Sequence, residues 1–74
     1  MIEKIIYIEG MQCEHCASRV EKALSLIDNV LEVNVSLEGK KAVIRTEKEI
    51  DNNKIIEAIE DIGFIVKEIK YLKR

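Results

Sequence analysis

The stretch "GMQCEHC" contains both cysteines of the chain, Cys13 and Cys16, and its single histidine, His15. Thiolates can hold a soft metal ion, exchange with a disulfide or close a disulfide of their own. A disulfide across so short a loop constrains the unfolded chain little, which disfavours a structural staple. Two thiolates without a further obvious ligand suit a soft, low-coordination ion such as Cu(I), whereas a closed zinc site takes four ligands. The stretch therefore predicts soft-metal binding.

Dithiol redox catalysis is the alternative from a different functional class. A CxxC pair after a strand and at a helix start is also the position used by thioredoxin-like oxidoreductases. Such proteins normally include a proline facing the cysteine pair, and this chain of 74 residues has no proline. The chain is also short for that fold. Both features favour metal binding over redox catalysis and predict that the protein is not an enzyme.

Four neighbours of the cysteines have open roles. The His15 ring is expected to diverge from the two sulfurs in a helical first turn, which leaves direct ligation, tuning of the site charge or simple exposure. Met11 is expected to plug the core beneath the loop, although a thioether can also ligate soft metals. Gly10 permits a tight turn into the loop. Phe64 is expected either to border the loop or to pack in the core.

Hydrophobic periodicity predicts the elements that position these residues. Alternating or isoleucine-rich runs indicate strands, and apolar residues at helical spacing indicate amphipathic helices. Glu38-Gly39-Lys40 is a hairpin candidate, with Gly39 supplying the positive φ. Asp51 or Asn52 is expected to cap the second helix and Gly63 to end it. The expected order is strand 2–9, helix 15–27, strand 32–38, strand 41–46, a helix from 51 or 52 to 62, and strand 64–72.

This β-α-β-β-α-β order predicts an α+β, ferredoxin-like sandwich. A four-stranded antiparallel sheet covered on one face by two helices is the economical arrangement. Residues 1–74 are too few for a second core and predict a single domain. The inward face of the last strand is ambiguous, because Phe64 and Val66 compete with Ile65, Lys67 and Ile69.

The predicted fold places the two cysteines where thiolates are favoured. Cys13 falls in the loop after the first strand and Cys16 in the first turn of the first helix. Unpaired backbone N–H groups and the positive end of the helix dipole stabilise negative charge there. The sulfurs are therefore expected to converge at a site that lowers thiol pKa values.

Charge and hydropathy exclude several classes of function. The formal net charge is −2 and the two signs are interspersed, which argues against nucleic-acid binding. Tyr7 and Tyr71 lack the basic surface of an RNA-stacking platform. The basic residues are expected to form a solvated surface. The absence of a signal peptide or an apolar run of about 18 residues predicts a cytoplasmic protein that is not membrane-embedded.

Three segments together resemble one known family. "GMQCEHC" at 10–16 resembles the G-M-x-C-x-x-C loop of heavy-metal-associated domains, and "EAIEDIGF" at 57–64 is similar to the end of their second helix. "VLEVNVSLEGKKAVI" at 30–44 stands where that family has its two middle strands. The resemblance implies that Cys13 and Cys16 are the metal ligands, that Met11 is the buried loop anchor, and that Phe64 borders the site.

The resemblance also implies a function. Members include small copper chaperones and the soluble amino-terminal domains of P-type ATPases. The implied activity is delivery of Cu(I) to the soluble metal-binding domain of such an ATPase by thiolate exchange, with Arg19 and Lys22 beside the loop in the partner surface. The alternative is a domain for Hg, Zn or Cd, or one excised from a transporting ATPase. A monomer is expected, or a dimer bridged by metal.

Overall fold

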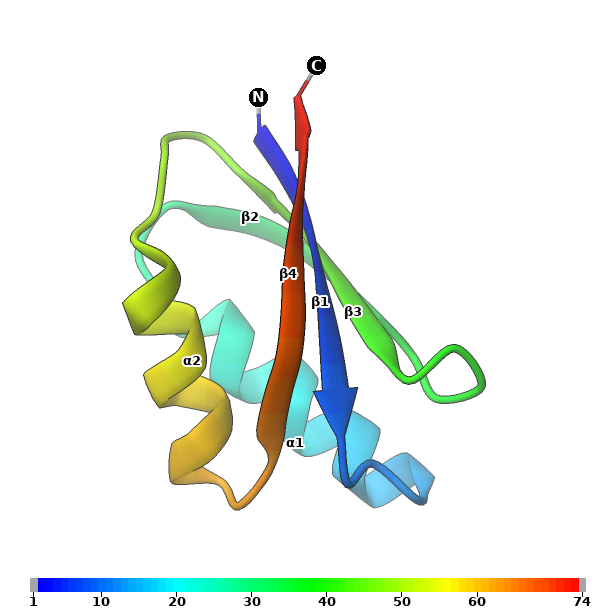
Figure 1. The fold of residues 1–74 in the computed structure, drawn as a ribbon. Helices are drawn as coiled ribbons and strands as arrows, with labels where there is room; N and C mark the ends of the chain where they lie inside the picture. Colours follow the sequence, from blue (N-terminus) through cyan, green and yellow to red (C-terminus); the bar gives the residue numbers. More distant parts are fainter. Residues whose placement is uncertain (1, 74) are drawn as a thin grey trace.

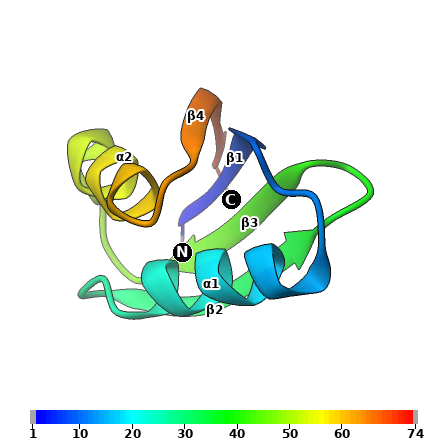
Figure 2. The ribbon, with the colours of Figure 1, turned by 90° about the horizontal axis from the view of Figure 1, so that it is seen from below.

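A computed structural model, which describes residues 2–73 and the side chains of residues 2–72, has the predicted order of elements. All strand pairings are antiparallel, and the sheet order is β2-β3-β1-β4. Both helices pack on one face of the sheet (Figures 1 and 2), which confirms the ferredoxin-like sandwich. The elements are β1 (Ile2–Glu9), α1 (Glu14–Ser25), β2 (Val30–Ser36), β3 (Lys41–Thr46), α2 (Asn52–Asp61) and β4 (Ile65–Lys73).

The core lies between the sheet and the two helices. Alternate residues of β1 and β3 face inward, and they meet apolar side chains at helical spacing on α1 and α2. Burying this apolar surface is the main term that stabilises the fold. The innermost apolar residues, each no more than 1% exposed, are Ile6, Ile8, Val20, Leu24, Ala42, Ile44, Ile55 and Ile59.

A β-bulge resolves the ambiguous face of β4. Ile8 pairs with Val66 and Tyr7 pairs with Glu68, so Lys67 is an extra residue opposite no residue of β1. The bulge reverses the alternation, and Val66 and Ile69 therefore both pack against the core. Leu31 is the corresponding extra residue of β2 in its pairing with β3.

The turns differ from the sequence expectations in two places. Lys40, with φ of 54°, rather than Gly39 supplies the positive φ of the hairpin, so that prediction was wrong. Gly39 instead donates its N–H to Ser36 Oγ at 3.0 Å. The first helix ends at Ser25 rather than at residue 27, because a turn begins at Leu26. Ile27 still packs against the core from beyond the helix end.

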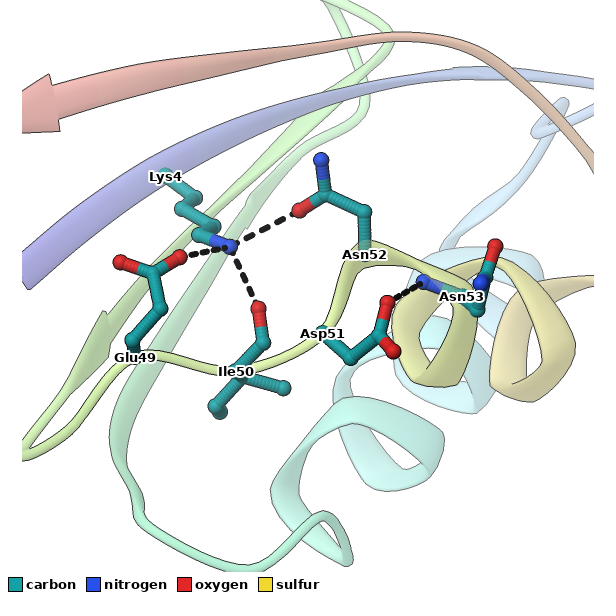
Figure 3. Close-up of polar contacts among 6 residues, drawn as sticks. All are labelled: Lys4, Glu49, Ile50, Asp51, Asn52 and Asn53. Carbon is teal, nitrogen blue, oxygen red and sulfur yellow. Dashed lines mark hydrogen bonds and ion pairs between the residues drawn. The ribbon is translucent and has the colours of Figure 1, made fainter.

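The start of α2 is tied to β1 by a buried lysine (Figure 3). Lys4, only 2% exposed, donates from Nζ to Ile50 O at 2.7 Å and to Asn52 Oδ1 at 2.8 Å, and it pairs with Glu49 Oε1 at 3.0 Å. The expectation that the basic residues lie on a solvated surface was wrong for Lys4, because these acceptors satisfy its charge. Asp51 caps α2, as predicted, by accepting from Asn53 N at 2.9 Å.

No helix in the described part of the chain is long and apolar enough to span a membrane.

Candidate metal centre

The loop between β1 and α1 carries both cysteines at one end of the molecule. Figure 1 shows this loop at the same end as the turn between α2 and β4, and at the opposite end from the two termini. Gly10 begins the loop with φ of 104°, a conformation that glycine adopts without strain. Cys13 is the N-cap of α1, and its carbonyl accepts from Cys16 N at 3.0 Å and Ala17 N at 3.1 Å. The first helical turn therefore fixes the spacing of the two cysteines.

The two sulfurs converge as the sequence predicts. The Cys13 and Cys16 Sγ atoms are 3.5 Å apart and both thiols are free. Cys13 is exposed, whereas Cys16 is half-buried and packs against the core. The Cys13 side chain caps no backbone N–H of α1. Its sulfur is therefore available to an ion or to an incoming thiolate.

The electrostatic environment favours the thiolate form of Cys16. A backbone hydrogen bond with Gln12, then the Cys13 thiol, and finally the charge of Arg19 hold the pKa of Cys16 below its ordinary value of 9.0, against a smaller opposing effect of desolvation. Gln12 is a contributor that sequence reasoning missed. Its position just before the helix start, where backbone N–H groups lack helical partners, is the signal that points to it.

Two apolar side chains support the loop from beneath. Met11 is 4% exposed and belongs to the core cluster, which confirms its predicted place in the core. Phe64 is 9% exposed and lies against Gly10, where an added β-carbon would stand 3.1 Å from its Cδ1 atom. Phe64 thus both packs in the core and borders the loop, and the two roles expected from the sequence are compatible.

The remaining candidate residues lie around the cysteines without completing a cage. His15, Arg19 and Lys22 are exposed on α1. Among the side chains of residues 2–72, no group of three or more His, Cys, Asp and Glu residues is close enough to hold a metal ion. Two thiolates of this kind suit a soft ion of low coordination number.

The sequence is similar to those of a copper chaperone and of part of a mercuric reductase. The chain is 40% identical over 68 residues to the copper chaperone CopZ of Staphylococcus haemolyticus, covering 90% of this chain and all of that protein. It is also 39% identical over 64 residues to a mercuric reductase of Shewanella putrefaciens, covering 86% of this chain but only 12% of that enzyme. The similarity to the reductase is confined to a small part of it.

Solved structures share the fold. A CopZ metallochaperone superposes with a TM-score of 0.81 at 37% identity, covering 86% of this chain and 97% of that one. A copper-binding domain from HMA7, a P-type ATPase, superposes with a TM-score of 0.80 at 30% identity, covering 99% and 96%. The family model for the heavy-metal-associated domain matches residues 5–64. With the cysteine loop and the second-helix ending inside that match, the chain belongs to the heavy-metal-associated domain family.

Proposed function

We propose that this protein carries Cu(I) between the Cys13 and Cys16 sulfurs and hands it to the soluble metal-binding domain of a P-type ATPase. Residues 1–74 act as a single heavy-metal-associated domain in the cytoplasm. The protein is a carrier rather than an enzyme. The observation that carries the proposal is the pair of free sulfurs 3.5 Å apart at an open end of the fold.

The sulfur geometry is compatible with capture of an ion. With metal–sulfur bonds of about 2.3 Å, a separation of 3.5 Å corresponds to a bent arrangement of roughly 100°. A linear arrangement requires a separation of about 4.6 Å with the same bonds. Cys13 is exposed, so its side chain has room to rotate, and we expect such a rotation to widen the angle on binding.

Transfer proceeds by exchange of thiolate ligands. A cysteine of the partner approaches the open side of the ion, a three-coordinate bridged intermediate forms, and one sulfur of this chain then leaves. A second partner cysteine displaces the remaining sulfur of this chain in the same way, so that the ion ends on two partner thiolates. The lowered pKa of Cys16 increases the fraction of thiolate that is available for capture and for exchange at a given pH. A closed site with four ligands would block this approach, because it leaves no free coordination position.

The docking surface beside the site includes Arg19 and Lys22. Both side chains are exposed on α1, one and two helical turns after Cys16 in the sequence. They favour carboxylates on the receiving domain, and this attraction weakens as salt is added. The similarity to a copper-binding ATPase domain and to a copper chaperone supports copper as the cargo and an ATPase domain as the receiver.

Anaerobic titration with Cu(I) against a competing chromophoric chelator tests the proposal. We expect tight binding of one ion per monomer, or of one per dimer bridged by metal. The Cys16→Ser variant should lose this binding while its circular dichroism is unchanged. The matched control is the double variant Cys16→Ser/Ser18→Cys, which keeps two thiols but breaks their spacing and should also fail to bind. Strong binding by that control would contradict the proposed ligand pair.

The mercuric reductase similarity makes other soft ions the second candidate. Repeating the competition with Hg(II), Zn(II) and Cd(II) distinguishes a copper carrier from a domain for another ion. Transfer is then measured by mixing the loaded protein with an isolated ATPase domain and separating the two by ion exchange. Reduction of a disulfide substrate at catalytic turnover, together with weak Cu(I) binding, would replace the carrier with a dithiol oxidoreductase.

A further inference from the structure

A hollow beside the cysteine loop has no part in the proposed metal site. It lies between the start of that loop and the hairpin that joins β2 to β3, which Figure 1 shows at the same end of the molecule. Its lining includes Gly10, Met11 and Gln12 of the loop together with Leu37 and Gly39 of the hairpin. Its volume of about 860 Å³ falls within the range of about 300 to 1,000 Å³ in which proteins bind small molecules. We call it the hairpin hollow.

The hairpin hollow is lined by two cations and one anion. Lys40 comes from the hairpin, Lys67 from β4 and Glu9 from the end of β1. All three side chains are exposed, and none of them forms an ion pair with another of the described side chains. Farther along β4, Glu68 and Lys70 pair with each other at 3.8 Å and add no net charge. The lining therefore offers three charges that the protein itself leaves without a partner.

Both lysines of the hairpin hollow stand at irregularities of the backbone. Lys40 has φ of 54°, a left-handed conformation that lysine adopts only at a cost in free energy, although a glycine precedes it. Lys67 is the bulge residue that has no partner on β1, and a bulge changes the direction in which a side chain points. Strained backbone of this kind is concentrated at functional positions. Two separate irregularities thus bring an unpaired lysine to the same hollow.

We propose that the hairpin hollow binds a small amino acid with two carboxylates and one ammonium group, such as glutamate. Each lysine pairs with one carboxylate, and Glu9 pairs with the ammonium group. Such a ligand has a net charge of about −1 at neutral pH, which complements two lysines and one glutamate. A dicarboxylate without the ammonium group leaves Glu9 facing a like charge, and a cationic ligand is repelled by both lysines.

The expected binding is weak and independent of metal. The bound amino acid lies beside Gln12, the residue before Cys13, on the hairpin side of the cysteine loop. The hairpin hollow needs neither an ion nor a second protein, so the proposal does not rest on the proposed function. Its ion pairs are exposed to solvent, and each such pair contributes little. We therefore expect a dissociation constant of about 1 mM.

Nuclear magnetic resonance of the isotope-labelled, metal-free protein, titrated with glutamate at low ionic strength, tests the proposal. Dithiothreitol serves as the reductant, because reductants and chelators that carry carboxylates compete for the lysines. We expect the backbone amides of Gly10, Gln12 and Gly39 to shift with one dissociation constant of about 1 mM. Glutamine, which lacks one carboxylate, and succinate, which lacks the ammonium group, should each bind at least about fivefold more weakly.

Single substitutions identify the groups that hold the ligand. Lys40→Gly and Lys67→Gln should each weaken glutamate binding at least about fivefold. Lys40→Gly should not lower the urea midpoint of unfolding, because glycine adopts the left-handed φ without strain, and this separates lost binding from misfolding. Glu9→Gln should weaken the binding of glutamate but not that of succinate, since succinate has no ammonium group for Glu9 to meet.

Matched controls carry the same loss of charge outside the hairpin hollow. Lys22→Gln on α1 and Lys48→Gln should bind glutamate like the unaltered protein, because neither residue lines the hollow. The proposal is overturned if the amides of the hollow do not shift at up to about 20 mM glutamate, or if the controls lose as much affinity as Lys40→Gly and Lys67→Gln. It is also overturned if glutamine or succinate binds as tightly as glutamate.

Discussion

The two ends of the molecule differ in how far their polar groups are buried and hydrogen-bonded. At the end near the termini, Lys4 is buried and its ammonium group has three acceptors within 3.0 Å. At the other end, Cys13 is exposed, and its sulfur lies 3.5 Å from the Cys16 sulfur. A buried charge must be fully satisfied to be tolerated, whereas a transferable ion requires ligands that are left incomplete. One end therefore stabilises the fold and the other remains available for chemistry.

The largest expected effect is a loss of Cu(I) affinity when Cys13 is replaced, without a loss of fold stability. Cys13→Ser should weaken Cu(I) binding at least about a thousandfold, or about 4 kcal/mol, because a hydroxyl is a poor ligand for a soft ion. The same change should stabilise the fold by about 0.5 to 1 kcal/mol, since serine at the N-cap can accept from a backbone N–H and Cys13 does not. Chelator competition and urea unfolding measure the two effects. A loss of stability would show that Cys13 supports the fold.

For Lys4, at the other end, we expect the reverse: a loss of fold stability with little change in Cu(I) affinity. Lys4→Ala should lower the free energy of unfolding by about 3 kcal/mol, because it leaves the Ile50 carbonyl without its donor and opens a cavity. Lys4→Met, which keeps most of the volume, should cost about 1 to 2 kcal/mol. Urea unfolding measures both values. Cu(I) affinity should change less than about threefold, and a larger loss would link the two ends.

Replacing Thr46 is expected to raise the free energy of unfolding, by less than the Lys4→Ala change lowers it. Its Oγ1 is buried and has no hydrogen-bond partner among the described residues. Thr46→Val should raise the free energy of unfolding by about 1 kcal/mol, because it removes an unsatisfied hydroxyl at nearly constant volume. Thr46→Ser, which keeps the hydroxyl and loses the methyl group, is the matched control and should lower stability. Destabilisation by valine would mean that the hydroxyl has a partner.

The pairing of Lys4 predicts a pH effect. The hydrogen bond from Lys4 lowers the pKa of Glu49 from its ordinary value of 4.5. A lowered folded-state pKa gives a contribution that is present above pH 4.5 and is lost as the pH falls below it toward the lower value. Glu49→Gln should therefore flatten the acid side of the stability profile. Glu47→Gln, at an exposed neighbour, is the matched control for the charge change, and urea unfolding at several pH values measures both profiles.

The smallest expected effect concerns the thiolate. The charge of Arg19 is the last of the causes that lower the pKa of Cys16, so Arg19→Gln should raise that pKa slightly toward 9.0. Lys22→Gln on the same helix is the matched control and should shift it less. Ultraviolet thiolate absorbance during a pH titration of the metal-free protein measures the change. An equal shift in both variants would indicate a general charge effect.

The local pattern predicted most of the fold and the convergence of the cysteines. The place of Cys16 in the first helical turn, the turn at Gly10 and the cap at Asp51 each depend on residues adjacent in sequence. Val66 and Ile69 could not both be assigned inward, because the bulge at Lys67 arises from pairing with β1. Whether Cys13 and Cys16 hold a metal remains a prediction from sequence.

The burial of Lys4 could not be predicted for a related reason. A lysine inside an apolar run is ordinarily placed with its charge in water. Its acceptors Ile50 and Asn52 are 46 and 48 positions away, so they become visible only when β1 and the start of α2 are brought together. The backbone contribution of Gln12 to the Cys16 pKa likewise depends on the loop conformation.

Lys67, the bulge residue of β4, bears on how readily the protein aggregates. β4 is an outer strand of the sheet and carries the exposed apolar residues Ile65 and Leu72. An outer strand that is flat and apolar invites other chains to extend the sheet, and a bulge with a lysine opposes this. Deleting Lys67 would leave Val66 and Ile69 facing inward but straighten the strand. Light scattering on storage should then show growth of large assemblies, and no increase over the unaltered protein would contradict a protective role for the bulge at Lys67.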